Sequence, residues 1–232
     1  MSDLYLKQVE VGPMQNYAYA VGSYSAKAAF LVDPAWEWER LQEMVRADGL
    51  ELAGVIQTHN HQDHVGGSLF GQYIPGLKEL LEAWDAAHET PLPVYLNPAE
   101  YDWLPVEPKD RRGSEDGTVV RVGEVSITCV HTPGHTPGSQ CLFINTPGEE
   151  TASLITGDTL FAGACGRVDL PQSNPEEMHR TLYERLPALP PSTVVYPGHS
   201  YNGAQTTTLA KELATNPYMQ FPSREAFLAA MR

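Results

Sequence analysis

The chain has 232 residues, of which 42% are hydrophobic and 19% are charged, and its 29 acidic and 15 basic side chains give a formal net charge of −14. This length and composition are typical of a globular domain with a full core. The acidic balance argues against nucleic-acid binding, which depends on Lys and Arg contacts with phosphates, and no segment approaches the ~18 consecutive apolar residues of a membrane span.

The pattern of apolar and turn-forming residues predicts mixed strands and helices in the first half. Alternating, aromatic or β-branched runs between turn residues indicate strands. Apolar residues at helical spacing that end at a glycine indicate a helix. In chain order, we expect strands at 4–11, 16–22 and 28–33, a helix at 36–49, a strand at 52–58, a helix at 76–88, a Pro-flanked apolar run at 92–96 and a short helix from Asn97.

The second half is predicted to begin with a polar loop over 110–120 and to continue with a strand-rich block. A helix is expected over 174–189, because Asn174 is a favourable cap and Pro175 suits a first helical turn. The remaining predicted elements are strands within 117–132, 139–145 and 151–158, a strand at 192–199 and a helix at 204–215.

Strands followed by a helix thus occur twice, which favours an α/β fold of two packed sheets with helices outside. We expect a single domain over 1–232. The stretch 68–104 is long and helical in pattern, and we interpret it as an insertion over one end.

The segment "THNHQDHVGG" places three of the eight histidines, and one aspartate, within six residues. Histidines this close repel one another once protonated, and a bound metal ion offsets that crowding. His59 and His61, two apart on an extended loop, are expected to point to one ion. Asp63 and His64 then fall on the other side and are available to a second ion.

Further metal donors are needed to complete two such sites, and three follow predicted strands. They are His135, Asp158 and His199. His88 and His179 lie inside predicted helices without a partner motif, so we interpret them as ordinary surface or satisfied residues. His131, which repeats the local sequence of His135 in "HTPGHTPG", is predicted to be a strand-end residue that supports its neighbours.

The motifs "THNHQDHVGG", "PGHTPGS", "TGD" and "YPGH" together resemble the metallo-β-lactamase fold superfamily, over nearly the whole chain. The resemblance implies an αββα four-layer sandwich, here with a helical insertion, and a metal site at the sheet ends. It also implies His59, His61 and His135 on metal one, Asp63, His64 and His199 on metal two, and Asp158 as a bridge between them.

The stretch that begins "GDTLFAGACGRVDLPQ" resembles glyoxalase II-like hydrolases and the related persulfide dioxygenases. The hydrolase resemblance implies two divalent ions (Zn and/or Fe) whose bound hydroxide attacks a thioester, with Asp63 orienting the nucleophile and Asp158 setting the metal spacing. The dioxygenase resemblance implies one Fe(II) held by His59, His135 and Asp158. Both sets of ligands are present, so ligand counting leaves the two alternatives open.

Short motifs favour hydrolysis on balance. "DHVGG" and "GPMQNYAYAVG" resemble the hydrolases, whereas "CGRVDLPQ" and "SREAFLAAM" resemble the dioxygenases. Only 33 residues follow His199, so we expect no counterpart of the C-terminal helical domain with which longer glyoxalase II enzymes bind glutathione. We therefore predict a thioester or ester hydrolase, with a persulfide dioxygenase as the alternative and a lactonase as a further one.

The resemblance also suggests substrate contacts at Arg167, which matches a "GCGR" element, and at Tyr201. Cys165, in the same glycine-rich turn, is interpreted as a small turn residue rather than a nucleophile, because no base is adjacent. Arg111 and Arg112 are interpreted as a solvated charge run. Six aromatic residues of the insertion either wall a substrate pocket or anchor the insertion: Phe70, Tyr73, Trp84, Tyr95, Tyr101 and Trp103.

The compartment and partners follow from composition and from the same resemblance. Three cysteines without CxxC spacing (Cys129, Cys141 and Cys165) and an N-terminus without a basic region and apolar stretch favour the reducing cytoplasm. Cys129 and Cys141 are expected in the core. The expected partner is a small-molecule substrate such as a glutathione derivative, with no nucleic acid and no membrane, and a homodimer is compatible with the sequence.

Overall fold

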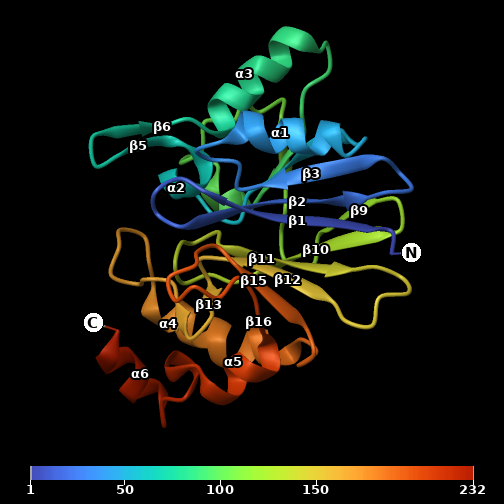
Figure 1. The fold of residues 1–232 in the computed structure, drawn as a ribbon. Helices are drawn as coiled ribbons and strands as arrows, with labels where there is room; N and C mark the ends of the chain where they lie inside the picture. The colour runs from blue at the N-terminus through green and yellow to red at the C-terminus, as the bar shows by residue number, and fades with distance from the viewer. Residues whose placement is uncertain (1, 232) are drawn as a thin grey trace.

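Two six-stranded sheets lie face to face in the computed structural model, which describes residues 2–231 (Figure 1). The first sheet has the strand order β1 (Leu4–Val11), β2 (Asn16–Ser23), β3 (Ala28–Val32), β4 (Glu51–Ile56), β7 (Val94–Leu96), β8 (Arg111–Gly113). The second has the order β16 (Thr207–Thr208), β15 (Val194–Pro197), β12 (Ser153–Gly157), β11 (Gln140–Asn145), β10 (Val125–His131), β9 (Val119–Val122).

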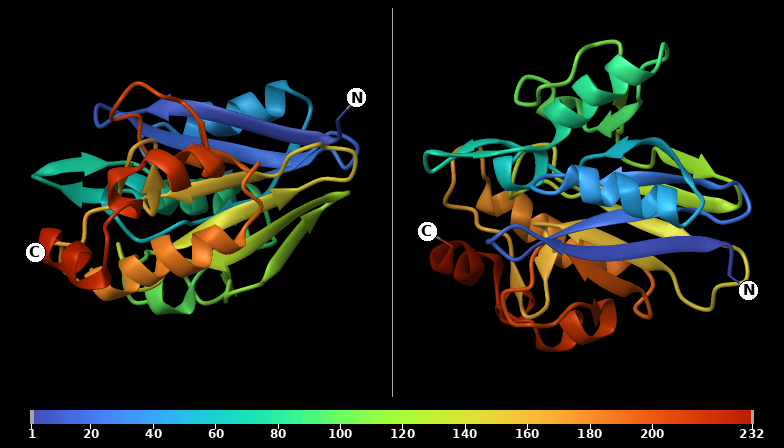
Figure 2. Two further views of the ribbon diagram at one scale, coloured as in Figure 1. Left: turned by 90° about the horizontal axis from the view of Figure 1, so that it is seen from below. Right: turned by 45° about the horizontal axis from the view of Figure 1, so that its top comes forward.

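Helices cover the outer face of each sheet, as the views in Figure 2 show. The first sheet carries α1 (Trp38–Ala47) and α3 (Leu77–Ala87), and the second carries α4 (Pro175–Arg180), α5 (Leu209–Thr215) and α6 (Arg224–Ala230). The predicted αββα sandwich is therefore confirmed.

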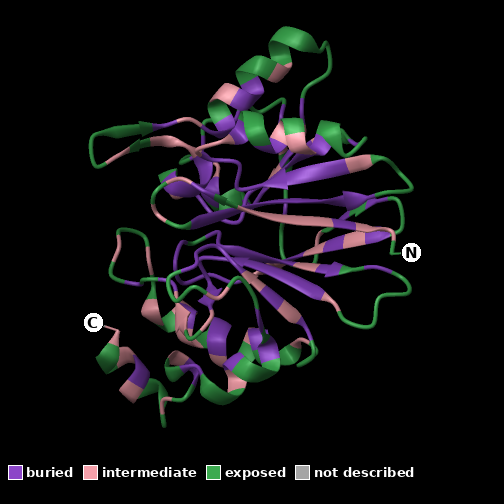
Figure 3. Cartoon of the chain, in the orientation of Figure 1, coloured by how far each residue is buried: buried purple, intermediate pink, exposed green. Residues whose placement is uncertain are grey.

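Strand β2 shows why the sheets stack in this way. All eight of its residues are buried, and successive side chains of a strand point to opposite faces. Ala18 and Ala20 join the core under α1 and α3, whereas Tyr17, Tyr19 and Val21 join the core between the sheets. Figure 3 shows β2 and most of the inner strands as buried, the edge strand β1 as largely intermediate, and the outer faces of the helices as exposed.

The stretch 68–104 is helical only in part. It contains most of a hairpin, β5 (Gly67–Leu69) with β6 (Gln72–Ile74), then α3, β7 and a single turn of 3₁₀ helix, η1 (Pro98–Glu100). Strand β7 pairs in parallel with β4 inside the first sheet, and Leu77 and Leu80 of α3 share a core cluster with Leu41 of α1. The stretch therefore builds part of the sheet and of the outer layer, while the hairpin projects from the edge (Figure 1).

Two local predictions need correction, and one helix was missed. The loop predicted over 110–120 includes β8, an edge strand that pairs in parallel with β7, because backbone pairing with a neighbouring strand overrides a polar sequence. The helix predicted at 204–215 starts only at Leu209, since Thr208 caps it and residues 207–208 pair with β15. Helix α6 was not predicted from its spacing.

Other predicted elements are confirmed with shifted ends. The Asn174 side chain accepts hydrogen bonds from the backbone N–H groups of Glu176 and Glu177, so the predicted cap of α4 is present. The helix continues beyond α4 through a π-helical turn, η2 (Thr181–Arg185), and a 3₁₀ turn, η3 (Leu186–Ala188). Within residues 2–231, none of the helices has both the length and the apolar character needed to cross a bilayer.

Candidate metal centre

The seven predicted ligands come from loops at one end of both sheets. His59 and His61 follow β4, and the short helix α2 (Gln62–Val65) carries Asp63 and His64. The other three follow the ends of β10, β12 and β15: His135, Asp158 and His199. The structure thus brings together all the residues that the sequence grouped.

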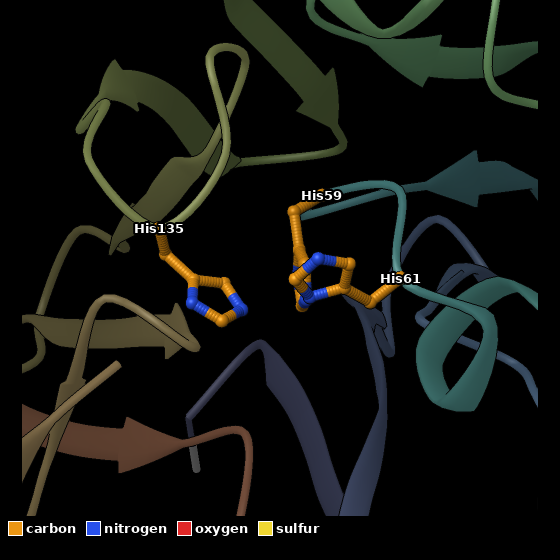
Figure 4. A group of neighbouring side chains, drawn as sticks. All are labelled: His59, His61 and His135. Atoms are coloured by element: carbon orange, nitrogen blue, oxygen red, sulfur yellow. The ribbon is translucent and has the colours of Figure 1, made fainter. Parts of the chain in front are cut away.

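The first cluster consists of three imidazoles. Ligand nitrogens of His59, His61 and His135 lie within 4.8 Å of one another, and Figure 4 shows the rings turned toward one another from two separate loops. The Nε2 atoms of His59 and His135 are buried without a hydrogen-bond partner, which is rare in native interiors unless an ion or water is bound. His135 Nδ1 lies 2.8 Å from the Arg167 carbonyl oxygen, an arrangement that leaves Nε2 free for a metal.

The second cluster consists of Asp63, His64 and His199, whose ligand atoms also lie within 4.8 Å of one another. His199 Nε2 lies 3.2 Å from His64 Nε2 and 3.3 Å from Asp63 Oδ2. The outer nitrogen of His199, Nδ1, is 3.0 Å from the Met14 carbonyl oxygen. This donor set, one carboxylate and two imidazoles, fits a divalent transition metal.

Asp158 lies between the two clusters. Its Oδ1 is 3.2 Å from His64 Nε2, and its Oδ2 is 3.5 Å from His135 Nε2. A Cβ at Gly198 would come within 2.4 Å of Asp158 Oδ1, so glycine at this position lets the loop carrying His199 approach the aspartate. The position fits a bridging ligand.

Burial sets the protonation of the first cluster. It lowers the pKa of His59 well below the usual range, and His64 nearby lowers it further. Burial together with His135 lowers the pKa of His61 to about 4, and burial also lowers the pKa of His135. These imidazoles are therefore neutral at pH 7, the form that binds metal.

In the second cluster, neighbouring charges set the protonation of the histidines instead. Burial alone would lower the pKa of His64 and His199, but Asp158 and Asp63 outweigh it, raising the pKa of His64 well above its usual value and that of His199 to about 9. The same pairing outweighs burial in Asp63 and Asp158, whose carboxyl pKa values both fall below the usual range. In metal-free protein, the two carboxylates thus favour protonation of this imidazole pair, which supplies part of the positive charge that a metal would otherwise bring.

These shifts predict a pH dependence for the metal-free protein. The raised pKa of His199 contributes stability that is complete below the unfolded value of 6.5 and is lost as the pH rises through about 9. We therefore expect the melting temperature of chelator-treated protein to fall between pH 6.5 and 9, relative to metal-loaded protein. A constant difference between the two forms over this range, measured by differential scanning fluorimetry, would contradict the charge assignment.

Sequence reasoning missed Asp33, at the end of β3. Its carboxylate accepts hydrogen bonds from the Thr58 N–H (2.8 Å) and the Thr58 hydroxyl (2.6 Å), and its Oδ2 lies 3.1 Å from His64 Nδ1. Asp33 therefore orients the His64 ring through its Nδ1 atom. It also orients the His59 ring indirectly, because the hydroxyl of Thr58 lies 3.0 Å from His59 Nδ1. Its position after a strand, as for three of the ligands, is the signal that could have identified it.

Glu100, on η1, is a second residue that the sequence did not indicate. Its buried carboxylate accepts hydrogen bonds from the Thr136 hydroxyl (2.8 Å) and the Gly138 N–H (2.5 Å). These bonds hold the loop that presents His135. On the other side of this loop, His131 Nε2 lies 2.9 Å from the Pro137 carbonyl oxygen, which agrees with the supporting role predicted for His131.

The remaining histidines and cysteines lie where the sequence suggested. His88 stacks on Trp84 (3.7 Å between ring centroids) and His179 on Tyr183 (4.4 Å). All three cysteines are free, and Cys129 and Cys141 are fully buried. Burial raises the pKa of Cys165 to about 12, so this thiol is a poor nucleophile at neutral pH.

A cavity of about 530 Å³ lies over the two clusters, and Arg167 and Tyr201 both contribute to its wall. Arg111 lies outside this wall, over the ring of Tyr101 at 5.0 Å. The aromatic residues of 68–104 were expected either to wall a substrate pocket or to anchor this stretch, and the structure shows some of each. Phe70 and Trp103 line the cavity, whereas Trp84, Tyr95 and Tyr101 pack against the hydrophobic cores and Tyr73 is exposed.

The fold and the ligand arrangement define a metallo-beta-lactamase superfamily protein, and the model of that superfamily matches residues 11–199, so the chain belongs to it. It is similar to bovine mitochondrial persulfide dioxygenase ETHE1 (30% identity over 93% of this chain and 76% of that protein). It is also similar to a probable hydroxyacylglutathione hydrolase of Schizosaccharomyces pombe (31% identity; 88% and 71% covered). Among solved structures, it resembles TTHA1623 in a di-iron-bound form (33% identity, TM-score 0.69; 91% and 99% covered). The predicted family is confirmed.

Proposed function

We propose that the chain is a metal-dependent hydrolase that cleaves a thioester or a related ester. One observation carries the proposal: two complete groups of three ligands lie next to each other, with Asp158 between them. A mononuclear Fe(II) centre would use only His59, His135 and Asp158, whereas a two-metal hydrolase would use both clusters. The similarity to a di-iron-bound structure and to a probable hydroxyacylglutathione hydrolase supports this proposal.

When bound, two such ions polarise a carbonyl and lower the pKa of a water toward about 7. The chain itself contributes Asp63, whose Oδ2 accepts a hydrogen bond from the Asn16 side chain at 2.9 Å. This ionised carboxylate faces the cavity and is placed to orient the attacking water. Water adds to the acyl carbon, the C–S bond breaks, and the sulfur leaves as a thiol after gaining a proton.

A persulfide dioxygenase is the second candidate, and the similarity to bovine ETHE1 favours it. It would use one Fe(II) on His59, His135 and Asp158 and consume O₂. A lactonase would use the same ligand clusters as the thioesterase, since a lactone is a cyclic ester.

A paired assay separates the two candidates. One arm measures hydrolysis of S-lactoylglutathione and of a neutral acyl thioester, and the other measures O₂ uptake with glutathione persulfide. Hydrolysis that disappears in His199→Ala supports the two-metal hydrolase, because this variant loses a ligand of the second cluster only. O₂ uptake that persists in His199→Ala, without hydrolysis in the wild type, would replace the hydrolase with the dioxygenase.

A further inference from the structure

The wall of the cavity above the metal centre is mostly apolar. Its floor carries ligands of both clusters, and its volume of about 530 Å³ is in the range of small-molecule sites. Much of its wall consists of apolar or aromatic side chains, among them Met14, Leu69, Phe70, Trp103, Phe161 and Tyr201. A substrate bound at the metals therefore meets hydrocarbon on several sides.

Phe70 has no evident role in folding. It lies at the tip of the β5–β6 hairpin with 93% of its surface exposed. Its φ is +49°, next to Gly71 at +81°, as a two-residue hairpin loop commonly requires, and a bulky residue in this left-handed region costs about 1–2 kcal/mol. An exposed aromatic side chain in a strained backbone conformation gains nothing from the core, and such residues are concentrated at binding sites.

Two further aromatic residues contribute exposed surface to the same cavity from other parts of the chain. Trp103 follows η1 and is 58% exposed, and Tyr201 follows β15 and is 60% exposed. Tyr201 stacks on the metal-ligand candidate His199, with 4.7 Å between ring centroids, and Phe161 meets Tyr201 edge to face. Aromatic surface thus extends from the metal centre to the rim.

The charges of the cavity do not match a glutathione carrier. Glutathione has two carboxylates and one ammonium group, so it requires cationic partners. Among the described residues that line the cavity, Arg167 is the one lysine or arginine. Its guanidinium already makes two hydrogen bonds to Asp169, at 2.9 and 2.8 Å.

Building on the hydrolase proposed above, we propose that this site takes thioesters with an apolar group beside the scissile bond, and that Phe70 and Trp103 determine this specificity. The apolar group belongs either to the acyl chain or to the thiol, and the cavity wall offers both the same aromatic surface. Burying a side chain such as Phe contributes about 1.5–3 kcal/mol, so each contact corresponds to at least about a tenfold change in specificity.

The test combines a substrate matrix with a binding measurement on the metal-loaded protein. Lactoyl and hexanoyl thioesters are each prepared on glutathione and on N-acetylcysteamine, and a hexyl thioester of acetate adds the apolar thiol. We expect kcat/KM to be higher for the apolar substrates than for S-lactoylglutathione. Phe70→Ala and Trp103→Ala are expected to reduce this preference about tenfold each, mainly through KM, whereas Tyr73→Ala, an exposed aromatic of the same hairpin outside the cavity wall, leaves it unchanged.

Calorimetry with non-hydrolysable thioethers distinguishes this inference from the hydrolase proposal. S-hexyl-N-acetylcysteamine should bind at least tenfold more tightly than S-methylglutathione, and Phe70→Ala should reduce this difference about tenfold. If no thioester is hydrolysed but this preference holds, the hydrolase proposal fails and the apolar specificity stands. If S-lactoylglutathione is the best substrate and the two variants leave its kcat/KM and the thioether affinities unchanged, the apolar specificity is wrong.

Discussion

Replacing His59 or Asp158 with alanine is expected to lower kcat/KM by at least about 10³-fold, because a bound ion supplies several kcal/mol of transition-state stabilisation that the variant cannot retain. His59 belongs to the first cluster, and Asp158 lies between the two clusters. Both residues are shared by the hydrolase and the dioxygenase, so the loss is expected whichever reaction the chain performs.

The fold should survive both changes. His59 Nε2 has no hydrogen-bond partner within the described chain, and circular dichroism of the variants should match that of the wild type. His88→Ala is the matched control, since this histidine is exposed and stacks only on Trp84 at the end of α3. Full activity in either ligand variant, or an equal loss in the His88 control, would refute the ligand assignment.

Asp33→Ala is expected to weaken both the fold and the metal site. The change leaves the Thr58 N–H and hydroxyl and the His64 Nδ1 without their buried acceptor, and an unsatisfied buried donor costs about 1–3 kcal/mol. We expect the free energy of unfolding to fall by about 2–4 kcal/mol even in metal-free protein. Metal affinity should fall about 10–100-fold, the usual effect of removing a residue that orients a ligand.

Asp48→Asn is the control for this prediction. Asp48 also accepts a long-range hydrogen bond, from Tyr5 at 2.8 Å, but it is more exposed, and its nearest cation, Lys7, lies at 3.7 Å. Its replacement should change stability by less than about 1 kcal/mol, since partly exposed interactions are weak, and should leave metal affinity unchanged. Urea unfolding and competition with a fluorescent chelator measure the two quantities. Unchanged metal affinity in Asp33→Ala would show that Asp33 does not position the ligands.

The grouping of the seven candidate ligands could be predicted from the sequence because its signals are local. His59, His61 and His64 lie within six residues, and His135 and His199 each follow a strand. Strands β10, β12 and β15 run in the same direction, so their carboxyl ends, and the candidate ligands that follow them, lie at the same edge of the second sheet. Asp33 and Glu100 were missed because each acts on a loop distant in sequence, and their hydrogen bonds exist only after folding.

The aromatic residues at the cavity could not be assigned from the sequence. The sequence alone does not distinguish the roles of Phe70, Trp84 and Trp103. Each was compatible with lining a pocket and with anchoring the stretch 68–104. Only the packing of α3 separates Trp84, which joins the first core, from Phe70 and Trp103, which stay exposed at the cavity. Likewise β8 was assigned to a loop because its three residues, Arg111–Gly113, carry no apolar pattern and form a strand only by pairing with β7.

The most direct test of the two-metal site is the metal content of the chain purified without added metal. Elemental analysis, with protein concentration from amino-acid analysis, should give about two transition-metal ions per chain in the wild type. His199→Ala should lower this number toward one, and Asp158→Ala should lower it further. A wild-type preparation that contains no transition metal and still turns over substrate would contradict the account.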